Sequence, residues 1–179
     1  MKALLQFAKG IDYLNHKASH LATWAVLFAA LISAGNAFIR YGFDKSSNGW
    51  LEIQWYLFAV TVMLGTGYVL QLNEHVRVDI FYGKLKRNGS VYVDLFGLIF
   101  FLLPVTIAMV YLSFPLFMGM LKSGEMSNNA GGLIRWPAML MLPLGFSLLT
   151  LQGVSEIIKR VGHLTGDHKM DLHYEKPVQ

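Results

Sequence analysis

Four long apolar segments decide most of what this chain can fold into. Residues 21–39 carry no charged side chain, and residues 50–72, 91–121 and 133–154 carry one each, close to the start of the segment. A bilayer core of roughly 30 Å takes about 20 apolar residues as a helix, so each segment is long enough to span a membrane. Charged residues make up only 15% of the chain, against about 25% in a typical soluble domain. We therefore predict an all-α integral membrane protein with four transmembrane helices.

The predicted organisation has three parts. Residues 1–18 place Leu4, Phe7 and Leu14 on an apolar stripe opposite Lys9 and Asp12, which predicts an amphipathic helix lying in the membrane interface; a disordered tail is the alternative. The membrane domain follows over residues 19–160, and residues 161–179 form a polar tail. The predicted spans cover about residues 21–41, 50–72, 91–121 and 133–155.

Two of these spans raise separate questions. Twenty residues precede the first apolar segment, and that segment is longer than the core of a signal peptide, so we predict that it is a retained span. The third span has 31 residues and would be about 46 Å long as a helix. It must tilt or bend, and Pro104 and Pro115 are the predicted kink points because each removes a backbone donor.

The distribution of basic residues predicts the orientation. Eleven of the 15 lysine and arginine residues lie in the N-terminal segment, in the loop before the third span, or after the fourth span. The other four are Arg40, Lys45, Lys122 and Arg135. Because excess positive charge stays in the cytoplasm, we predict that both termini are cytoplasmic.

Several classes of function are disfavoured by what the spans lack. No Asp, Glu, Lys, Arg or His lies in the middle of a span, whereas coupled transporters usually need such a group. The absence of cysteine excludes disulfides and thiolate ligands. None of the six histidines is central in a span, which disfavours a pair of haem ligands. We predict no catalytic residue, no metal site and no cofactor, and no enzymatic activity.

Polar residues gather instead at the two ends of the predicted bundle. At the non-cytoplasmic end, Arg40, Glu52 and Arg135 lie at a similar depth to Trp50. Either this is an aromatic belt with headgroup contacts, or Glu52 pairs with one of the two arginines. At the cytoplasmic end we predict a polar layer. Its members are Gln71, Glu74, His75, Arg77, Asp94, Gln152, Glu156, Lys159 and Arg160.

The loop NEHVRVDIFYGKLKR, residues 73–87, holds the densest charge. Arg77 can pair with Asp79 or with another acid, Glu74, Asp94 or Glu156. Asp79 can also cap a short helix. The basic residues that follow, Lys84, Lys86 and Arg87, suit anionic headgroups. The alternative is a solvated loop that only sets the topology.

The order of several short motifs resembles a known family. Arg40 and Tyr41 close the first span, Trp50 and Glu52 open the second, and Gly65 lies in its middle. His75, Arg77 and Asp79 form the most specific block, HVRVD, and Pro143 and Gly145 lie in the fourth span. Over about residues 15–160 this pattern is similar to the small membrane subunit of TRAP (tripartite ATP-independent periplasmic) transporters, the DctQ-type family.

The resemblance implies a non-catalytic role in the bacterial inner membrane. Such a subunit braces the scaffold of a large TRAP membrane subunit that imports organic acids or related solutes on a sodium gradient. Its implied partners are that large subunit, a periplasmic solute-binding protein and membrane phospholipids, and no nucleic acid. The residues implied in structural, partner or lipid contacts are Arg40, Tyr41, Trp50, Glu52, Gly65, His75, Arg77, Asp79, Arg135, Pro143 and Gly145.

Two positions depart from the family pattern. Ile53 follows Glu52 where a second acid is common, and Glu74 stands where a glycine often precedes the histidine. The glycine- and asparagine-rich loop 123–137 resembles the branch associated with mannitol or chloroaromatic compounds, although a carboxylate is the default substrate. Two other functions stay open, an independent small four-helix transporter and a membrane anchor subunit of a redox complex.

Overall fold

The computed structural model describes residues 1–45, 47–73 and 87–169. Four of its helices are long and apolar enough to cross a membrane, which confirms the predicted all-α fold with four transmembrane helices. The described chain contains no strand, only an isolated antiparallel bridge between Met126 and Ile134. The elements are α1 (Lys2–Phe43), α2 (Asn48–Leu72), α4 (Arg87–Gly97), the π-helix η1 (Leu98–Leu102), α5 (Leu103–Ser123) and α6 (Trp136–Leu164).

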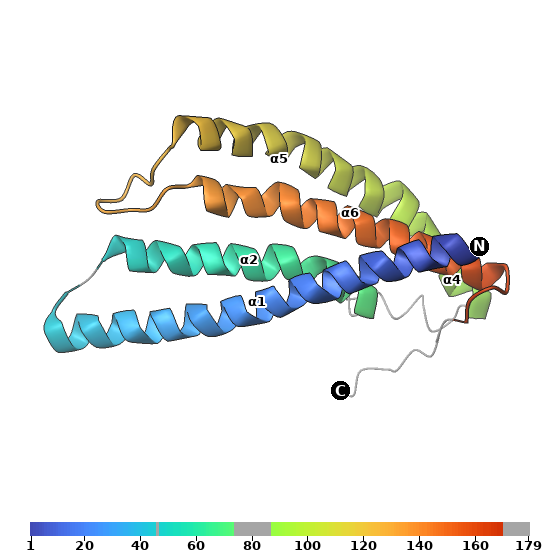
Figure 1. Ribbon diagram of the computed structural model, residues 1–179, viewed down its shortest axis with the longest axis horizontal. Helices are drawn as coiled ribbons and strands as arrows, with labels where there is room; N and C mark the ends of the chain where they lie inside the picture. The colour runs from blue at the N-terminus through green and yellow to red at the C-terminus, as the bar shows by residue number, and fades with distance from the viewer. Residues whose placement is uncertain (46, 74–86, 170–179) are drawn as a thin grey trace.

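The helices are arranged around α6 and α2 (Figure 1). α1 packs on α2 and on α6, α2 packs on α6, and α4, η1 and α5 pack mainly on α6. The connections from α1 to α2 and from α5 to α6 lie at one end of the bundle, and the N-terminus and the end of α6 lie at the other (Figure 1). The two loops predicted to share a side therefore do so. Which side faces the cytoplasm stays a prediction.

α1 is a single continuous helix of 42 residues. At 1.5 Å per residue it is about 63 Å long, roughly twice the thickness of a bilayer core. The predicted interfacial segment and first span are thus joined without a break. The reason lies in a line of buried residues at helical spacing that runs through both segments and packs on the bundle. These residues are Ala8, Ile11, Asn15, Ala18, Ala22 and Ala25.

Small residues let the helices approach closely. A Cβ atom on Gly145 of α6 would lie 2.6 Å from the Cβ atom of Met63 on α2 and 2.8 Å from its carbonyl oxygen. A Cβ atom on Gly67 of α2 would lie 2.1 Å from Oδ1 of Asn15 on α1. Glycine at these two positions therefore sets the distances from α2 to its two neighbours.

The third span departs from regular helix next to a proline. α4, η1 and α5 follow one another without a gap, and the N–H of Leu103 donates to the carbonyl of Leu98, five residues back. Pro104 follows directly and has no N–H to donate, so the wider turn falls where an α-helical hydrogen bond is lost anyway. Pro115 lies inside α5, which continues through it.

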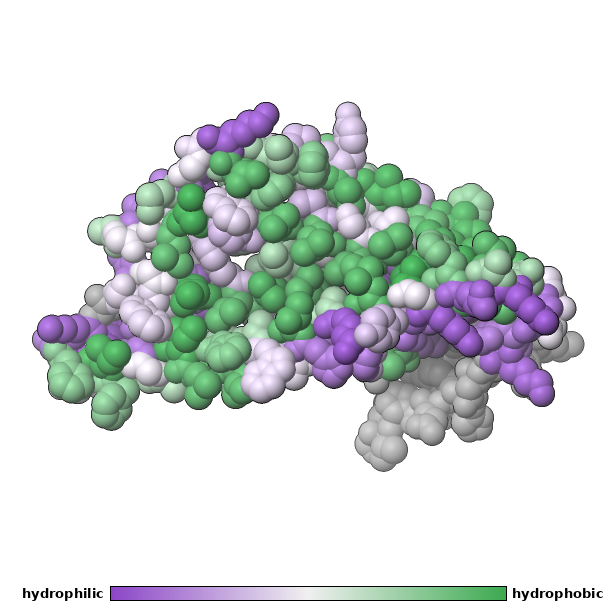
Figure 2. Space-filling model, viewed as in Figure 1, coloured by the Kyte–Doolittle hydropathy of each residue, from purple (hydrophilic) through white to green (hydrophobic). Residues whose placement is uncertain are grey.

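The surface of the bundle is mostly apolar. Figure 2 shows hydrophobic residues across the middle of the visible face and hydrophilic residues toward its ends, with a polar strip along the N-terminal half of α1. Several large side chains are at least half exposed, among them Trp24, Phe28, Phe101 and Tyr111. In a membrane protein such surface faces lipid or another subunit.

Candidate functional site

The connection from α5 to α6, residues 124–135, folds back on itself as a hairpin loop. The N–H of Ser127 donates to the carbonyl of Leu133 at 2.9 Å, and the N–H of Arg135 donates to the carbonyl of Glu125 at 3.0 Å. Gly124 and Gly131 have φ values of 63° and 70°, a region that favours glycine. The glycines of this segment therefore shape a defined turn.

Glu52, in the first turns of α2, holds this hairpin loop. The residue is only 3% exposed. Its carboxylate accepts hydrogen bonds from the Ser127 hydroxyl, from Nδ2 of Asn129 at 2.7 Å and from the N–H of Leu133 at 2.6 Å. A buried carboxylate needs such donors to offset the loss of water. All three come from the hairpin loop, so Glu52 ties that loop to α2.

Neighbouring residues of α2 add two more contacts to the hairpin loop. The Tyr56 hydroxyl donates to the carbonyl of Ile134 at 2.7 Å, and Nδ2 of Asn48 donates to the carbonyl of Ala130 at 2.9 Å. A Cβ atom on Gly132 would lie 2.9 Å from Oε1 of Glu52. The loop therefore follows the surface of α2 closely, and a glycine is needed where it passes the carboxylate.

The predicted ion pair of Glu52 with Arg40 or Arg135 is wrong. All three residues are described, and Arg135 instead pairs with Glu125 at the loop surface. Arg40 lies in the exposed last turn of α1. The physical reason is that three donors of the hairpin loop already occupy the Glu52 carboxylate.

At the opposite end of the bundle, five ionisable residues form a charged cluster: Asp12, Asp94, Glu156, Lys159 and Arg160. Arg160 is 3% exposed. Its Nε and Nη2 atoms donate to Oδ2 of Asp94 at 3.1 and 2.9 Å, and Nη1 pairs with Glu156. Lys159 pairs with Glu156 and with Asp12 at 3.2 Å. The cluster thus joins α1, α4 and α6.

Neutral side chains extend the charged cluster into the bundle. Nε2 of Gln152 and the Ser155 hydroxyl each donate to Oδ1 of Asp12 at 2.8 Å. Nδ2 of Asn15 donates to Oε1 of Gln152 at 2.9 Å. Because Asp12 accepts hydrogen bonds from three residues of α6, the N-terminal half of α1 is fastened to that helix by polar contacts.

The structure reproduces part of the predicted polar layer. It brings together Asp94, Gln152, Glu156, Lys159 and Arg160. Oε1 of Gln71 is buried and has no hydrogen-bond partner among the described residues. Glu74, His75 and Arg77 lie outside the described residues, as does Asp79.

Sequence reasoning missed Asp12, Asn15 and Ser155. Asp12 was expected on the water side of an interfacial helix, but it faces α6. A usable signal existed, since Asn15 continues the line of Ala8 and Ile11 at helical spacing. A polar residue in an otherwise small, apolar line indicates a polar partner on the helix opposite.

The remaining residues of the family motif take different positions. Tyr41 and Trp50 are 88% and 50% exposed, at the end of the bundle that carries the hairpin loop. Pro143 and Gly145 are buried in α6. Gly65 is partly buried, and a Cβ atom there would meet only Ala22 of α1, at 3.9 Å. That Gly65 contacts another subunit stays a prediction.

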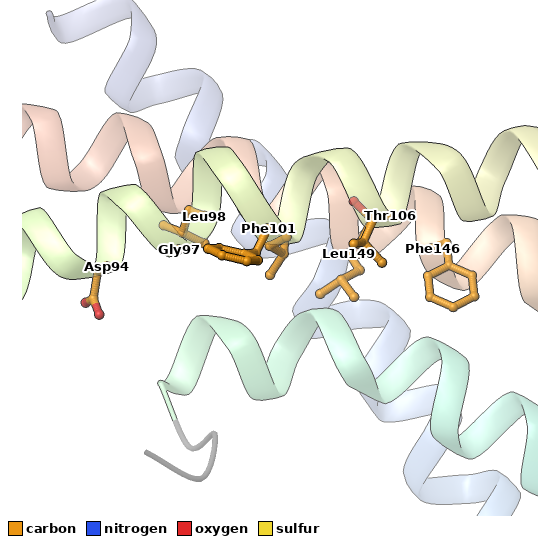
Figure 3. A pocket seen from close by; sticks show the side chains of 9 residues that line it. Asp94, Gly97, Leu98, Phe101, Thr106, Phe146 and Leu149 are labelled. Atoms are coloured by element: carbon orange, nitrogen blue, oxygen red, sulfur yellow. The ribbon is translucent and has the colours of Figure 1, made fainter. Parts of the chain in front are cut away.

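An apolar groove of about 480 Å³ runs along α4, η1 and α5 where they lean on α6 (Figure 3). Phe101 and Leu98 line it from the third span, and Phe146 and Leu149 line it from α6. Among the described residues that line it, Asp94 is the one ionisable residue, and it is held by Arg160. The groove therefore has the character of a membrane-facing surface.

These features place the chain in the class of multi-pass helical membrane proteins. The ion pairs between its described residues lie at the two ends of the bundle. The model of one family, the DctQ component of tripartite ATP-independent periplasmic transporters, matches residues 29–163. The chain belongs to this family and is a small component of a TRAP transporter, which confirms the resemblance. No significant match was found among curated proteins or among solved structures.

Proposed function

We propose that this chain is the non-catalytic small subunit of a sodium-driven TRAP importer for organic acids or related solutes. It lies in the bacterial inner membrane and braces the scaffold of the large transporting subunit. The family match over residues 29–163 carries this proposal. The interior of the bundle supports it in two ways.

The first support is the position of the charges. Coupled transport of a charged solute normally uses ionisable or polar groups near the middle of the membrane. In the described part of the chain, the ion pairs lie at the two ends. The pair of Arg135 with Glu125 lies at one end, beside the hydrogen-bonded Glu52, and the charged cluster lies at the other. The hydrophobic core cluster consists of the small and apolar residues Ala18, Ala22, Leu64 and Leu148.

The second support is that the buried charged groups are occupied within the chain. Glu52 accepts hydrogen bonds from three donors of the hairpin loop, and Arg160 contacts both Asp94 and Glu156. Groups committed to internal contacts hold helices in place. This arrangement suits a rigid brace better than a site that must bind and release an ion.

The proposed partners follow from the two kinds of surface. The large subunit and phospholipids would cover the exposed apolar faces, which include Trp24 and Leu31 of α1 and Tyr111 of α5. If both termini are cytoplasmic, the hairpin loop faces the periplasm, where the solute-binding protein works. Met126 is 58% exposed on that loop and offers an adaptable apolar contact.

Uptake by reconstituted vesicles tests the proposal. Large subunit, small subunit and solute-binding protein together should import a labelled carboxylate when sodium is higher outside, and the small subunit alone should import nothing under the same gradient. Import by the small subunit alone would show an independent transporter. Equal import without a sodium gradient would contradict the sodium-driven mechanism.

A further inference from the structure

Two histidines form a close pair on α1, outside the two polar ends described above. His16 and His20 are four residues apart and therefore share one face of the helix. Their Nε2 atoms are 3.2 Å apart, and their ring planes cross at 77°. Both residues are exposed. The apolar segment of the first span begins at residue 21, so the pair lies just outside it, in reach of water.

The separation of the two nitrogens matches a metal chelate. Zinc binds imidazole nitrogen at 2.0–2.1 Å, so two nitrogens on one ion are roughly 2.9 to 3.4 Å apart for angles between square and tetrahedral geometry. The observed distance of 3.2 Å falls within this range. In that state each neutral ring carries its proton on Nδ1 and presents Nε2 to the ion.

The surroundings hold the pair in place. The ring of Tyr68 on α2 packs against His16 with centroids 5.3 Å apart, which restricts the imidazole from one side. Nζ of Lys17, the nearest basic residue in sequence, lies 5.4 Å from the centroid of the Tyr13 ring. This cation–π contact holds the ammonium at the Tyr13 ring, where it keeps its positive charge.

We propose that His16 and His20 form a two-imidazole site for a late first-row divalent cation of the Zn²⁺, Ni²⁺ or Cu²⁺ class. Imidazole is a preferred ligand of these ions. Water fills the remaining positions, so the site is open rather than a closed structural centre. The bound ion would cross-link one turn of α1 where that helix leaves the membrane. This site is independent of the proposed transport role.

Titration of the purified full chain with ZnCl₂, followed by calorimetry, tests the site. The parent chain should bind one Zn²⁺ that His16→Gln and His20→Gln each weaken at least about tenfold, because even loss of a residue that only supports a ligand costs that much. His168→Gln removes one imidazole elsewhere and should leave this binding unchanged.

A second variant guards against a trivial loss of structure. Exchanging Lys17 and His20 keeps composition and charge but puts the two imidazoles at adjacent positions, which do not face each other on a helix. This exchange should also abolish the site while circular dichroism shows unchanged helix content. The proposal is overturned if the parent binds no Zn²⁺, or if the exchanged chain binds it as tightly as the parent. In either case the pair would be a hydrogen-bonded contact only.

Discussion

Glu52 acts on parts of the chain that lie 75 to 81 residues away. Donors of the hairpin loop take the place of the water molecules that would otherwise solvate its carboxylate. The surface pair of Arg135 with Glu125 is different, since both side chains are more than 40% exposed and such pairs contribute little. Glu52 and Glu125, two acids near the same end of the bundle, therefore contribute very differently to its stability.

The substitution Glu52→Gln should loosen the hairpin loop. The carboxamide keeps the size of the side chain but replaces one acceptor oxygen with an N–H₂ donor. That donor then faces either the Leu133 N–H or the donors of Ser127 and Asn129, so at least one contact is lost. We expect cleavage within residues 124–135 by a protease to become several-fold faster while the helices persist. Glu125→Gln is the matched control and should leave the rate near that of the parent. Equal rates for both variants would refute the role given to Glu52.

Gly145 offers a test of the contact between α6 and α2. In Gly145→Ala the new methyl group would meet the backbone of Met63 at less than contact distance, and overpacking of this kind costs about 1–3 kcal/mol. We expect a lower midpoint of thermal unfolding in detergent. Gly119→Ala, on α5, has nothing within 4 Å of the new atom and should unfold like the parent. A Gly145→Ala chain as stable as the parent would mean that α2 and α6 are less tightly packed than described.

Among the elements, the third span is tied to α6 by an ion pair between described residues. α4, η1 and α5 pack mainly on α6, and Asp94 of α4 is tied to Arg160 of α6. The charged cluster therefore stabilises the contact between the third span and α6 at the end of the bundle that carries the N-terminus.

Arg160→Ala should destabilise that end of the bundle. It leaves Asp94 and Glu156 without the guanidinium, and breaking a buried pair costs about 3–5 kcal/mol. Hydrogen exchange should become faster for the amides of α4 and of the last turns of α6. Arg135→Ala removes the exposed pair instead and should change stability by no more than about 1 kcal/mol. Unchanged protection of α4 in Arg160→Ala would argue against the tie.

The existence of the spans could be predicted because hydropathy over about 20 residues is a local property. The continuity of α1 could not, since it depends on packing against α6 and α2 by residues such as Ala8 and Asn15. The contacts of Glu52 escaped prediction for a related reason. Its donors come from a distant loop whose shape depends on Gly124 and Gly131. The polar layer was predicted in part because Gln152, Glu156 and Arg160 share one face of a single helix.

For the molecule as a whole, the bias of basic residues predicts that both termini are cytoplasmic. The chain has no cysteine, so single cysteines can be introduced without background. Ser47→Cys and Asn128→Cys lie at the end with the two connections and should react with a membrane-impermeant thiol reagent added outside the cell. Asp167→Cys, exposed at the other end, should react only after the membrane is opened. The reverse pattern would invert the orientation.

The whole molecule exposes apolar side chains on its described helices and keeps its buried charges for internal contacts. Such a body is suited to widen and stiffen a larger membrane protein. The most direct measurement is purification of the tagged chain after expression with the large membrane subunit of its own transporter. We predict that the large subunit is retained in constant proportion through detergent extraction and size-exclusion chromatography. A chain that elutes alone, with the intact large subunit in separate fractions, would contradict the proposed bracing role.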